Sequence, residues 1–506
     1  MSKSDPGTSA ETKPQLVRDL GLIDATAIVM GSMIGSGIFI TSAESARLVG
    51  SPGWLLAAWV LAGILTVTGA MCAGEVAAMM PHAGGQYIFL REAYGKPVGF
   101  LFGWSTFLVV QTGTIAAVAV AFAKFLGVFL PAVAPNSYLV EPIKLGPYAL
   151  SLSTQQLTAI VLIIGLTLLN TRGLKAGSTL QNVFTFTKTA ALIGLIVVGL
   201  IGASKAGAAF TSSWWDADAN GWTLAKADKE VAALGVAGTI GFIMLFGKAL
   251  VGPLFSQTAW NTVTFTGGET KDPGRVLPRA LLMGTASVVL LYLLANVGYV
   301  LTLSLDQIQH ADQDRVGTAT MDAVFGPIGV YLMAGAILIS TSGCVNGLVL
   351  SGARVYYAMA RDGLFFRAIG TTNQRHVPAV ALVLQCVWAC LLTLPRTVEK
   401  DGTFGNVYGQ LLEYITSADL SFYTIMVASV IVLRFRAPKM ERPYRTPLYP
   451  LPAVIYIVLA CLIILDLIIV VPWTSGIGFA LVLTGVPVYF LWTAFNRGRS
   501  PSSTTS

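Results

Sequence analysis

The stretch Gly31-Ser32-Met33-Ile34-Gly35-Ser36-Gly37 places three glycines and two serines inside an otherwise apolar run near the start of the chain. Glycine adopts non-helical backbone conformations at little cost, so a helix formed by this run is expected to unwind here. A second apolar run is interrupted in a similar way between Gly252 and Thr258. Interruptions at corresponding places in two halves of a chain are typical of membrane folds built from inverted repeats.

The composition places these interruptions inside a lipid bilayer. Hydrophobic residues make up 54% of the 506 residues and charged residues only 11%, whereas a soluble protein carries about 25% charged residues. Apolar runs of about 20 residues can cross a bilayer, and only helices satisfy their backbone there. We predict twelve such helices: Leu22 to Val49, Gly53 to Met79, Lys96 to Leu130, Thr154 to Asn170, Thr179 to Ile201, Val231 to Thr266, Val276 to Leu303, Phe325 to Met359, Pro378 to Leu394, Gly405 to Leu433, Leu451 to Val470 and Gly476 to Phe495.

Two repeats of five helices organise this prediction, because the interrupted helices are the first and the sixth of the twelve. The predicted fold class is an all-α polytopic membrane protein. Its expected parts are a disordered cytoplasmic N-terminus (1–20), the first inverted repeat (21–202), an extracellular loop (203–230), the second inverted repeat (231–436), two further helices (437–497) and a cytoplasmic tail (498–506).

The basic residues indicate how the bundle lies in the membrane. Lys and Arg accumulate on the cytoplasmic side of membrane proteins, and most of the 32 here fall in segments on the same side as the N-terminus. Both termini are therefore predicted to be cytoplasmic, in the inner (plasma) membrane of a cell. This belt of positive charge accounts for the net charge of +7 without a nucleic-acid surface.

The interruptions also predict the kind of ligand. Backbone N–H groups freed at Gly35-Ser36-Gly37 carry partial positive charge and suit a carboxylate. Carbonyl groups freed at Phe255 and Thr258 can accept hydrogen bonds from an ammonium group. Together they would hold a small zwitterion, such as an α-amino acid, without charged side chains. The alternative is that Gly31 and Gly35 form a GxxxG pair that serves only close helix packing.

Three motifs resemble those of the amino acid, polyamine and organocation transporter superfamily. They are Gly31-Ser-Met-Ile-Gly-Ser-Gly-Ile-Phe39, Phe255-Ser-Gln-Thr-Ala-Trp-Asn261 and Ser342-Gly-Cys-Val-Asn-Gly347. The likeness runs from Leu20 to Arg497 and is greatest to the L-type amino acid transporters, particularly prokaryotic ones. It implies a LeuT-type fold of five plus five inverted helices with two appended. It also implies a sodium-independent exchanger of L-amino acids, with neutral ones as the expected substrates.

The resemblance assigns roles to residues at both interruptions. The substrate carboxylate is expected on the amides of Ser36 and Gly37, and the ammonium on the carbonyls of Met33, Phe255 and Thr258. The aromatic ring of Phe255 is expected to act as an outer gate. The other residues expected to line the site are Ile34, Gly35, Ser256, Gln257, Thr114 and Asp419.

Lys188 lies deep in the fifth predicted helix, where an unpaired ammonium group is costly. Snorkelling to the lipid surface is the alternative, but the residue is far from either helix end. In the family this lysine stands where sodium-coupled relatives bind a sodium ion. The resemblance implies that Lys188 contacts carbonyls near Gly31 and groups near Ser342, which removes the need for sodium.

Asp419 departs from the family pattern, in which many L-type relatives have a neutral residue at this position. Its carboxylate could favour a cationic side chain, bind a proton, or be neutralised within a structural network. A proton-coupled carrier of cationic amino acids or polyamines is therefore the alternative within transport. Three further ionisable residues of the predicted helices, Glu75, Lys248 and Asp466, have no partner that the sequence identifies.

Other classes of function find less support. The histidines, His82, His310 and His376, are scattered in the sequence at helix ends or in loops, so we expect no enzyme, no cofactor and no metal site. A membrane sensor that binds amino acids without moving them stays open. Eukaryotic L-type carriers join a heavy chain through a loop cysteine, but the loop Pro131 to Ser153 has none. No disulfide-linked heavy chain is therefore expected; the cysteines are Cys72, Cys344, Cys386, Cys390 and Cys461.

Overall fold

Helices make up most of the chain. The structure is a computed structural model, and it describes residues 20–81, 84–172, 174–206, 213–373, 377–398 and 403–497. The longer helices are α4 (Pro52–Met79), α7 (Gln111–Phe129), α8 (Thr154–Thr171), α9 (Leu174–Ala206), α14 (Pro273–Thr302), α17 (Pro327–Arg361), α18 (Ala379–Leu392), α19 (Val407–Arg436), α20 (Leu451–Val470) and α21 (Pro472–Arg497). The shorter ones are α1 (Leu22–Met33), α2 (Gly37–Ile40), α3 (Ser42–Val49), α5 (Gln86–Tyr94), α6 (Lys96–Ser105), α10 (Leu224–Ala227), α11 (Lys229–Ala233), α12 (Gly238–Ala249), α13 (Val251–Ser256), α15 (Leu305–Gln309) and α16 (Val316–Phe325).

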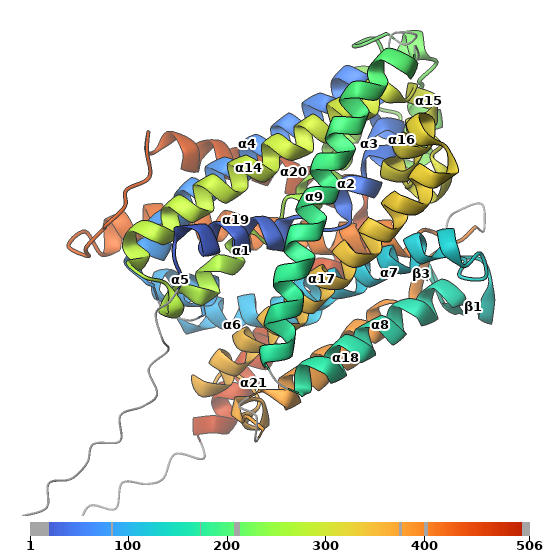
Figure 1. The fold of residues 1–506 in the computed structure, drawn as a ribbon. Helices are drawn as coiled ribbons and strands as arrows, with labels where there is room; N and C mark the ends of the chain where they lie inside the picture. The colour runs from blue at the N-terminus through green and yellow to red at the C-terminus, as the bar shows by residue number, and fades with distance from the viewer. Residues whose placement is uncertain are drawn as a thin grey trace, which may run out of the picture.

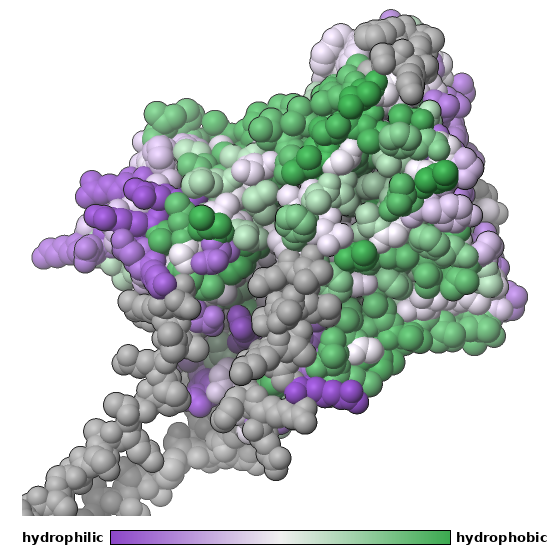
Figure 2. All heavy atoms as spheres, viewed as in Figure 1, coloured by the Kyte–Doolittle hydropathy of each residue, from purple (hydrophilic) through white to green (hydrophobic). Residues whose placement is uncertain are grey.

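Eleven helical segments of the described residues are long and apolar enough to cross a membrane. The predicted span Pro378 to Leu394 corresponds to α18, which is apolar but has only 14 residues. Figure 2 shows apolar side chains over most of the visible side of the bundle, between more polar ends. The chain is thus a multi-pass membrane protein.

A small sheet departs from the all-α prediction. Strands β1 (Tyr138–Leu145) and β2 (Tyr148–Ser153) form an antiparallel hairpin, and β3 (Pro395–Thr397) pairs with β2. The segment Pro131 to Ser153 was expected to be a loop, because no long apolar run marks it. Its backbone groups instead find partners across the hairpin and in a loop far along the sequence, which is the physical reason for the difference.

The interrupted helices lie in the middle of the bundle. In Figure 1, α1 and α2 lie behind α9, with α14 on one side and α17 on the other. α14 packs against α1, α4 and α9, while α17 packs against α7 and α9. Where α9 meets α14, a Cβ added to Gly199 would lie 2.9 Å from the Cα of Gly298, so glycine is needed for this close crossing. α13 packs against α2, α4 and α19, so the bundle encloses both interruptions.

Candidate functional site

The first interruption lies between α1 and α2. α1 ends at Met33, Ile34 takes an extended conformation with ψ of 98°, and α2 begins at Gly37. α2 passes through Thr41 directly into α3. Because the first N–H groups of a helix have no acceptor within it, the amides at the start of α2 face the gap. The predicted unwinding of this segment is confirmed.

The second interruption follows α13. That helix ends at Ser256, and a 3-10 helix begins at Trp260. Between them, Ala259 has a φ of 66°, a left-handed conformation that residues with a Cβ rarely adopt. The chain therefore turns sharply between the two helical segments, as the sequence predicted.

The two interruptions touch each other. A Cβ added to Gly37 would lie 2.8 Å from the Cβ and 3.0 Å from the Cα of Ser256, so this approach requires glycine. The hydroxyl oxygens of Thr41 and Ser256 lie 3.3 Å apart. A Cβ added to Gly35 would lie 3.4 Å from the sulfur of Cys344, which belongs to α17. The segments Met33 to Gly37 and Phe255 to Thr258 thus come together in one buried place.

Two of the expected ammonium acceptors already have donors. The Met33 carbonyl accepts a hydrogen bond from the hydroxyl of Tyr292 at 2.9 Å. The Phe255 carbonyl accepts from the Thr258 hydroxyl at 2.8 Å and from the Thr258 amide at 3.1 Å. A carbonyl oxygen has two lone pairs, so Met33 can accept a second donor, whereas Phe255 must release one.

Tyr408 is a site residue that the sequence analysis did not select. It lies in the first turn of α19, and its hydroxyl oxygen is 3.3 Å from the Ser36 hydroxyl oxygen. Its ring meets the Phe255 ring edge to face, with centroids 6.3 Å apart. The ammonium of buried Lys124 lies 5.3 Å from the centre of the same ring. No sequence motif contains Tyr408. The only signal in the sequence is that it is an aromatic residue near the start of a predicted helix.

Lys188 is fully buried in α9, and its ammonium donates a hydrogen bond to the carbonyl of Gly31. The bond ties α9 to the last turn of α1, beside the first interruption. The expected contact with Gly31 is therefore present. The hydroxyl of Ser342, near the other expected contact, donates instead to the carbonyl of Leu338 at 2.8 Å.

Asp419 and Gln257 line a small chamber behind the second interruption. Asp419 belongs to α19 and is 5% exposed, and Gln257 follows α13 and is 1% exposed. The two residues thus lie close together, and their role in binding a substrate stays a prediction. Thr114 of α7 does not line this chamber. Its hydroxyl donates a hydrogen bond to the carbonyl of Val110 at 2.6 Å, one turn earlier in the chain.

Of the three other ionisable residues in the predicted helices, two form ion pairs. Glu75 of α4 accepts two hydrogen bonds from Arg434, at 2.9 and 2.7 Å, and one from the amide of Thr446. Lys248 pairs with Asp228 at 2.8 Å. One carboxylate oxygen of Asp466 is buried without a partner among the described residues. Glu75 and Lys248 thus belong to ion pairs that the sequence could not identify.

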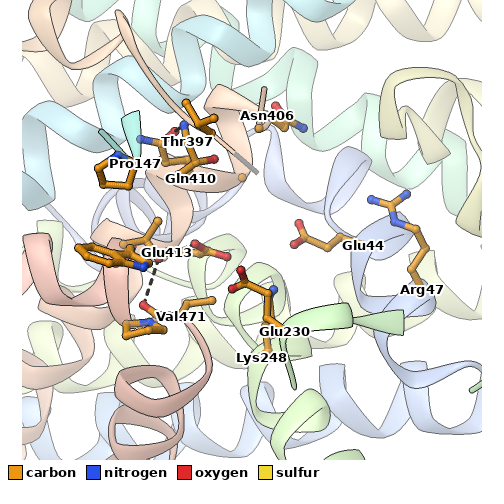
Figure 3. A pocket seen from close by; sticks show the side chains of 16 residues that line it. Glu44, Arg47, Pro147, Glu230, Lys248, Thr397, Asn406, Gln410, Glu413 and Val471 are labelled. Carbon is orange, nitrogen blue, oxygen red and sulfur yellow. Dashed lines mark hydrogen bonds between the residues drawn. The ribbon is translucent and has the colours of Figure 1, made fainter. Parts of the chain in front are cut away.

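A cavity of about 430 Å³ lies at the end of the bundle that carries the sheet, and we call it the vestibule. Figure 3 shows Glu44, Glu230 and Glu413, from three separate parts of the chain, facing this space. The cations beside it have partners: Lys248 pairs with Asp228, and Arg47 pairs with Asp314 at 2.8 Å. The lining therefore combines three carboxylates with two cations.

A family model described as amino acid permease matches residues 20–495, which includes both interruptions and the helices around them. The chain belongs to the amino acid permease family. The permease is 28% identical over 505 residues to the large neutral amino acids transporter small subunit 2 of Rattus norvegicus, covering 97% of this chain and 85% of that one.

Two other relatives have similar coverage. The serine/threonine exchanger SteT of Bacillus subtilis is 28% identical to the permease, over 94% of this chain and 97% of its own. The b(0,+)-type amino acid transporter 1 of Mus musculus is 25% identical, over 98% of this chain and 92% of its own. The resemblance drawn from the motifs is thereby confirmed, and the named relatives are transporters rather than enzymes.

Proposed function

We propose that the permease is a sodium-independent exchanger of neutral L-amino acids that works by alternating access. The observation that carries the proposal is the direct contact between the two helix interruptions, at Gly37 and Ser256. Each interruption offers backbone groups to the same buried place. The family and the names of the relatives support amino acids as the cargo.

In this proposal the substrate is held by its backbone groups. The carboxylate binds the amides of Ser36 and Gly37 at the start of α2, where N–H groups and the helix dipole favour negative charge. The ammonium binds the carbonyls of Met33 and Thr258, and that of Phe255 once the Thr258 hydroxyl turns away. Gly35, Ile34 and Ser256 shape the wall between these groups.

The gate consists of two rings rather than the one expected from the sequence. Phe255 and Tyr408 lie edge to face, and Gly409 and Gln410, which follow Tyr408 in α19, line the vestibule. The Tyr408 hydroxyl touches Ser36, so binding of a carboxylate at Ser36 changes the surroundings of both rings. Alternating access then moves one group of helices against the other around this point, within a fold of twelve helices and two inverted repeats.

Lys188 supports sodium independence. A fixed ammonium beside the Gly31 carbonyl supplies a positive charge where a bound sodium ion would otherwise join helices. We further propose that the permease works without a disulfide-linked heavy chain, since residues 131–153 contain no cysteine. We also propose that the permease lies in the inner (plasma) membrane of the cell, with both termini in the cytoplasm.

Liposomes that contain only the purified chain test this proposal. Preloaded with unlabelled alanine, they should take up labelled alanine in potassium buffer as fast as in sodium buffer. They should take up little when nothing is loaded inside. Strict dependence on sodium, or on an added partner protein, would contradict the proposal. Binding without any flux would indicate a sensor.

A second candidate is a proton-coupled carrier of cationic amino acids or polyamines. The observation that favours it is the buried carboxylate of Asp419. Uptake of leucine, alanine, arginine and putrescine, measured side by side with and without a pH gradient, separates the two. The second candidate predicts arginine or putrescine uptake that Asp419→Asn abolishes.

A further inference from the structure

The small sheet at one end of the bundle has two unlike faces, because successive side chains of a strand point to opposite sides. One face carries small and polar side chains of β2, all of them buried: Ala149, Ser151 and Ser153. The other face, which we call the apolar face, consists of Tyr148, Leu150 and Leu152 of β2 and their partners in β1, Leu145, Ile143 and Val140.

The pairing of β1 with β2 is shifted in a way that keeps the apolar face apolar. Val140 and Ile143 are three residues apart, so in a regular strand they would point to opposite sides. A register shift between them returns both to the same face. Glu141 falls within the shifted segment, and Lys144 belongs to the opposite face. The strand therefore keeps both of its charges off the apolar face.

The described part of the chain leaves the apolar face largely uncovered. Its aliphatic side chains Val140, Ile143, Leu145 and Leu150 are between 41% and 59% exposed. Apolar side chains gathered on an outer surface mark a place that contacts a membrane or another protein. The surroundings of the sheet decide between these two partners.

The two helices beside the sheet are short for a bilayer, whose hydrocarbon core is about 30 Å thick. At about 1.5 Å per residue, the 18 residues of α8 span about 27 Å and the 14 residues of α18 about 21 Å. α8 begins directly after β2, and α18 ends just before β3. The sheet therefore lies at the same end of both helices, as Figure 1 shows for β1 and α8.

The missing apolar length is available only at the sheet end. At the other end, Arg172 follows α8 directly, and Arg375 comes shortly before α18 in the sequence. Figure 2 shows apolar side chains along the lower right edge of the molecule, where α8 and α18 lie in Figure 1. The exposed side chains of the two helices include Leu157, Val161, Leu168, Val383, Val387 and Leu391. The lipid-facing surface of α8 and α18 thus continues onto the apolar face.

Aromatic residues indicate the depth of the sheet in the membrane. The Tyr148 hydroxyl donates to the Trp473 carbonyl at 3.3 Å, and Trp473, at the start of α21, is 63% exposed. Tyr and Trp are enriched where lipid headgroups meet acyl chains. Strand β1 is an open edge of the sheet, and open edges are not tolerated among the acyl chains. Both observations place the sheet at this boundary rather than deeper.

We propose that the apolar face of the sheet lies on the membrane, at the boundary between headgroups and acyl chains of the leaflet on the sheet side. Its partner is lipid rather than a protein. The side chains of β1 and β2 then supply the apolar length that α8 and α18 lack, which reduces the mismatch between these helices and the bilayer. This attachment does not depend on what the permease transports.

Fluorescence quenching in liposomes tests the proposal. Ile143→Cys and Leu145→Cys are each labelled with the fluorophore NBD in the purified full chain and reconstituted into phosphatidylethanolamine and phosphatidylglycerol vesicles. The matched control is Glu141→Cys, on the same strand but outside the apolar face. The unmodified protein, treated in the same way, gives the background from its own cysteines. Thermal unfolding in detergent shows that each variant is folded.

Lipids that carry a nitroxide near the headgroup end of the acyl chain should quench the labels at Ile143 and Leu145 several fold more than the label at Glu141. Iodide on both sides of the membrane should quench in the reverse order. Equal quenching of all three labels by iodide would overturn the proposal, because the face would then lie in water. Protection of the Ile143 label from both quenchers, lost on dilution with lipid, would equally overturn it, since a second copy of the chain would cover the face.

Discussion

At the scale of single residues, a charged group and a polar group contact the two ends of the first interruption. Lys188 bonds to the Gly31 carbonyl in the last turn of α1, and Tyr408 touches the hydroxyl of Ser36, where the unwound segment ends. Neither side chain faces a described opposite charge in these contacts. Such groups fix the shape of an interrupted helix rather than neutralise a neighbour, so their removal should affect motion before binding.

Lys188→Ala should slow exchange of alanine by at least tenfold while weakening alanine binding by less than threefold. The ammonium that joins α9 to the end of α1 is lost, whereas the backbone groups proposed to hold the substrate stay. Flux in liposomes and equilibrium binding in detergent give the two numbers. Lys144→Ala, at an exposed lysine of β1, is the control. Unchanged turnover of Lys188→Ala would remove the lysine from the mechanism.

The sequence pointed to several residues that lie at or beside the two interruptions, but not to their partners. Gly35, Ser36, Lys188 and Gln257 were selected because glycine, buried charge and polar atoms are unusual inside apolar runs. Tyr408 was missed because an aromatic residue in a membrane helix is ordinary, and only packing brings it to Ser36. Partners such as Arg434 for Glu75 lie on helices whose arrangement a single sequence does not reveal.

At the scale of elements, the contact between α2 and the end of α13 is tight enough to test directly. Gly37→Ala should reduce exchange strongly, because the new Cβ meets the Cβ and Cα of Ser256 at 2.8 and 3.0 Å. Adding Ser256→Gly to that variant removes the obstructing Cβ and should restore part of the activity. Gly165→Ala in α8, where a Cβ meets nothing within 4 Å, should leave exchange unchanged.

Failure of the double variant to recover would contradict the idea that steric contact of the two interruptions limits exchange. A Gly37→Ala protein with normal exchange would contradict the contact itself. Thermal unfolding of all three variants in detergent shows whether a loss of exchange follows from a loss of folded protein.

The ion pair between α12 and the segment before α11 predicts a dependence of stability on pH. Burial alone raises the pKa of Asp228, but the Lys248 ammonium at 2.8 Å and two backbone amides outweigh it and hold that pKa below its usual 3.8. A carboxyl with a lowered pKa stabilises the folded state above its unfolded value, and this stabilisation disappears as pH falls through the folded pKa.

Asp228→Asn should therefore lower the melting temperature by several degrees at pH 7, since breaking a buried pair costs about 3 kcal/mol. The difference from the unmodified protein should stay constant down to about pH 4 and become smaller only below it. Asp306→Asn removes an exposed pair with His310 and should have little effect. A difference that already vanishes near pH 6 would refute the assignment to Asp228.

The sequence predicted the ends of a helix correctly where its apolar run has sharp ends. The run Leu451 to Val470 coincides with α20, because Pro450 and Pro472 flank it closely. The π-helical turn Thr106–Val110 between α6 and α7 and the sheet were not foreseen. Both depend on how neighbouring helices or loops pack, and apolar composition carries no sign of either.

At the scale of the whole molecule, the distribution of charge predicts which ends of the helices face the cytoplasm. A cysteine placed on the hairpin, Glu141→Cys, should react with a membrane-impermeant maleimide applied to intact cells. Lys439→Cys, in the loop between α19 and α20, should react only after the membrane is opened. The unmodified protein gives the background from its own cysteines. The reverse pattern would show that the termini lie outside.

The sheet also restrains the start of helix α19. Strand β3 is hydrogen-bonded to the hairpin, and the Thr397 amide donates to the side chain of Gln410 at 2.9 Å. Gln410 lies within the first turns of α19, close in sequence to Tyr408. The hairpin between α7 and α8 is thereby linked, through β3, to the first turns of α19. A tilt at the start of α19 would pull on the hairpin, so this hydrogen-bonded link limits how far the Tyr408 ring can move.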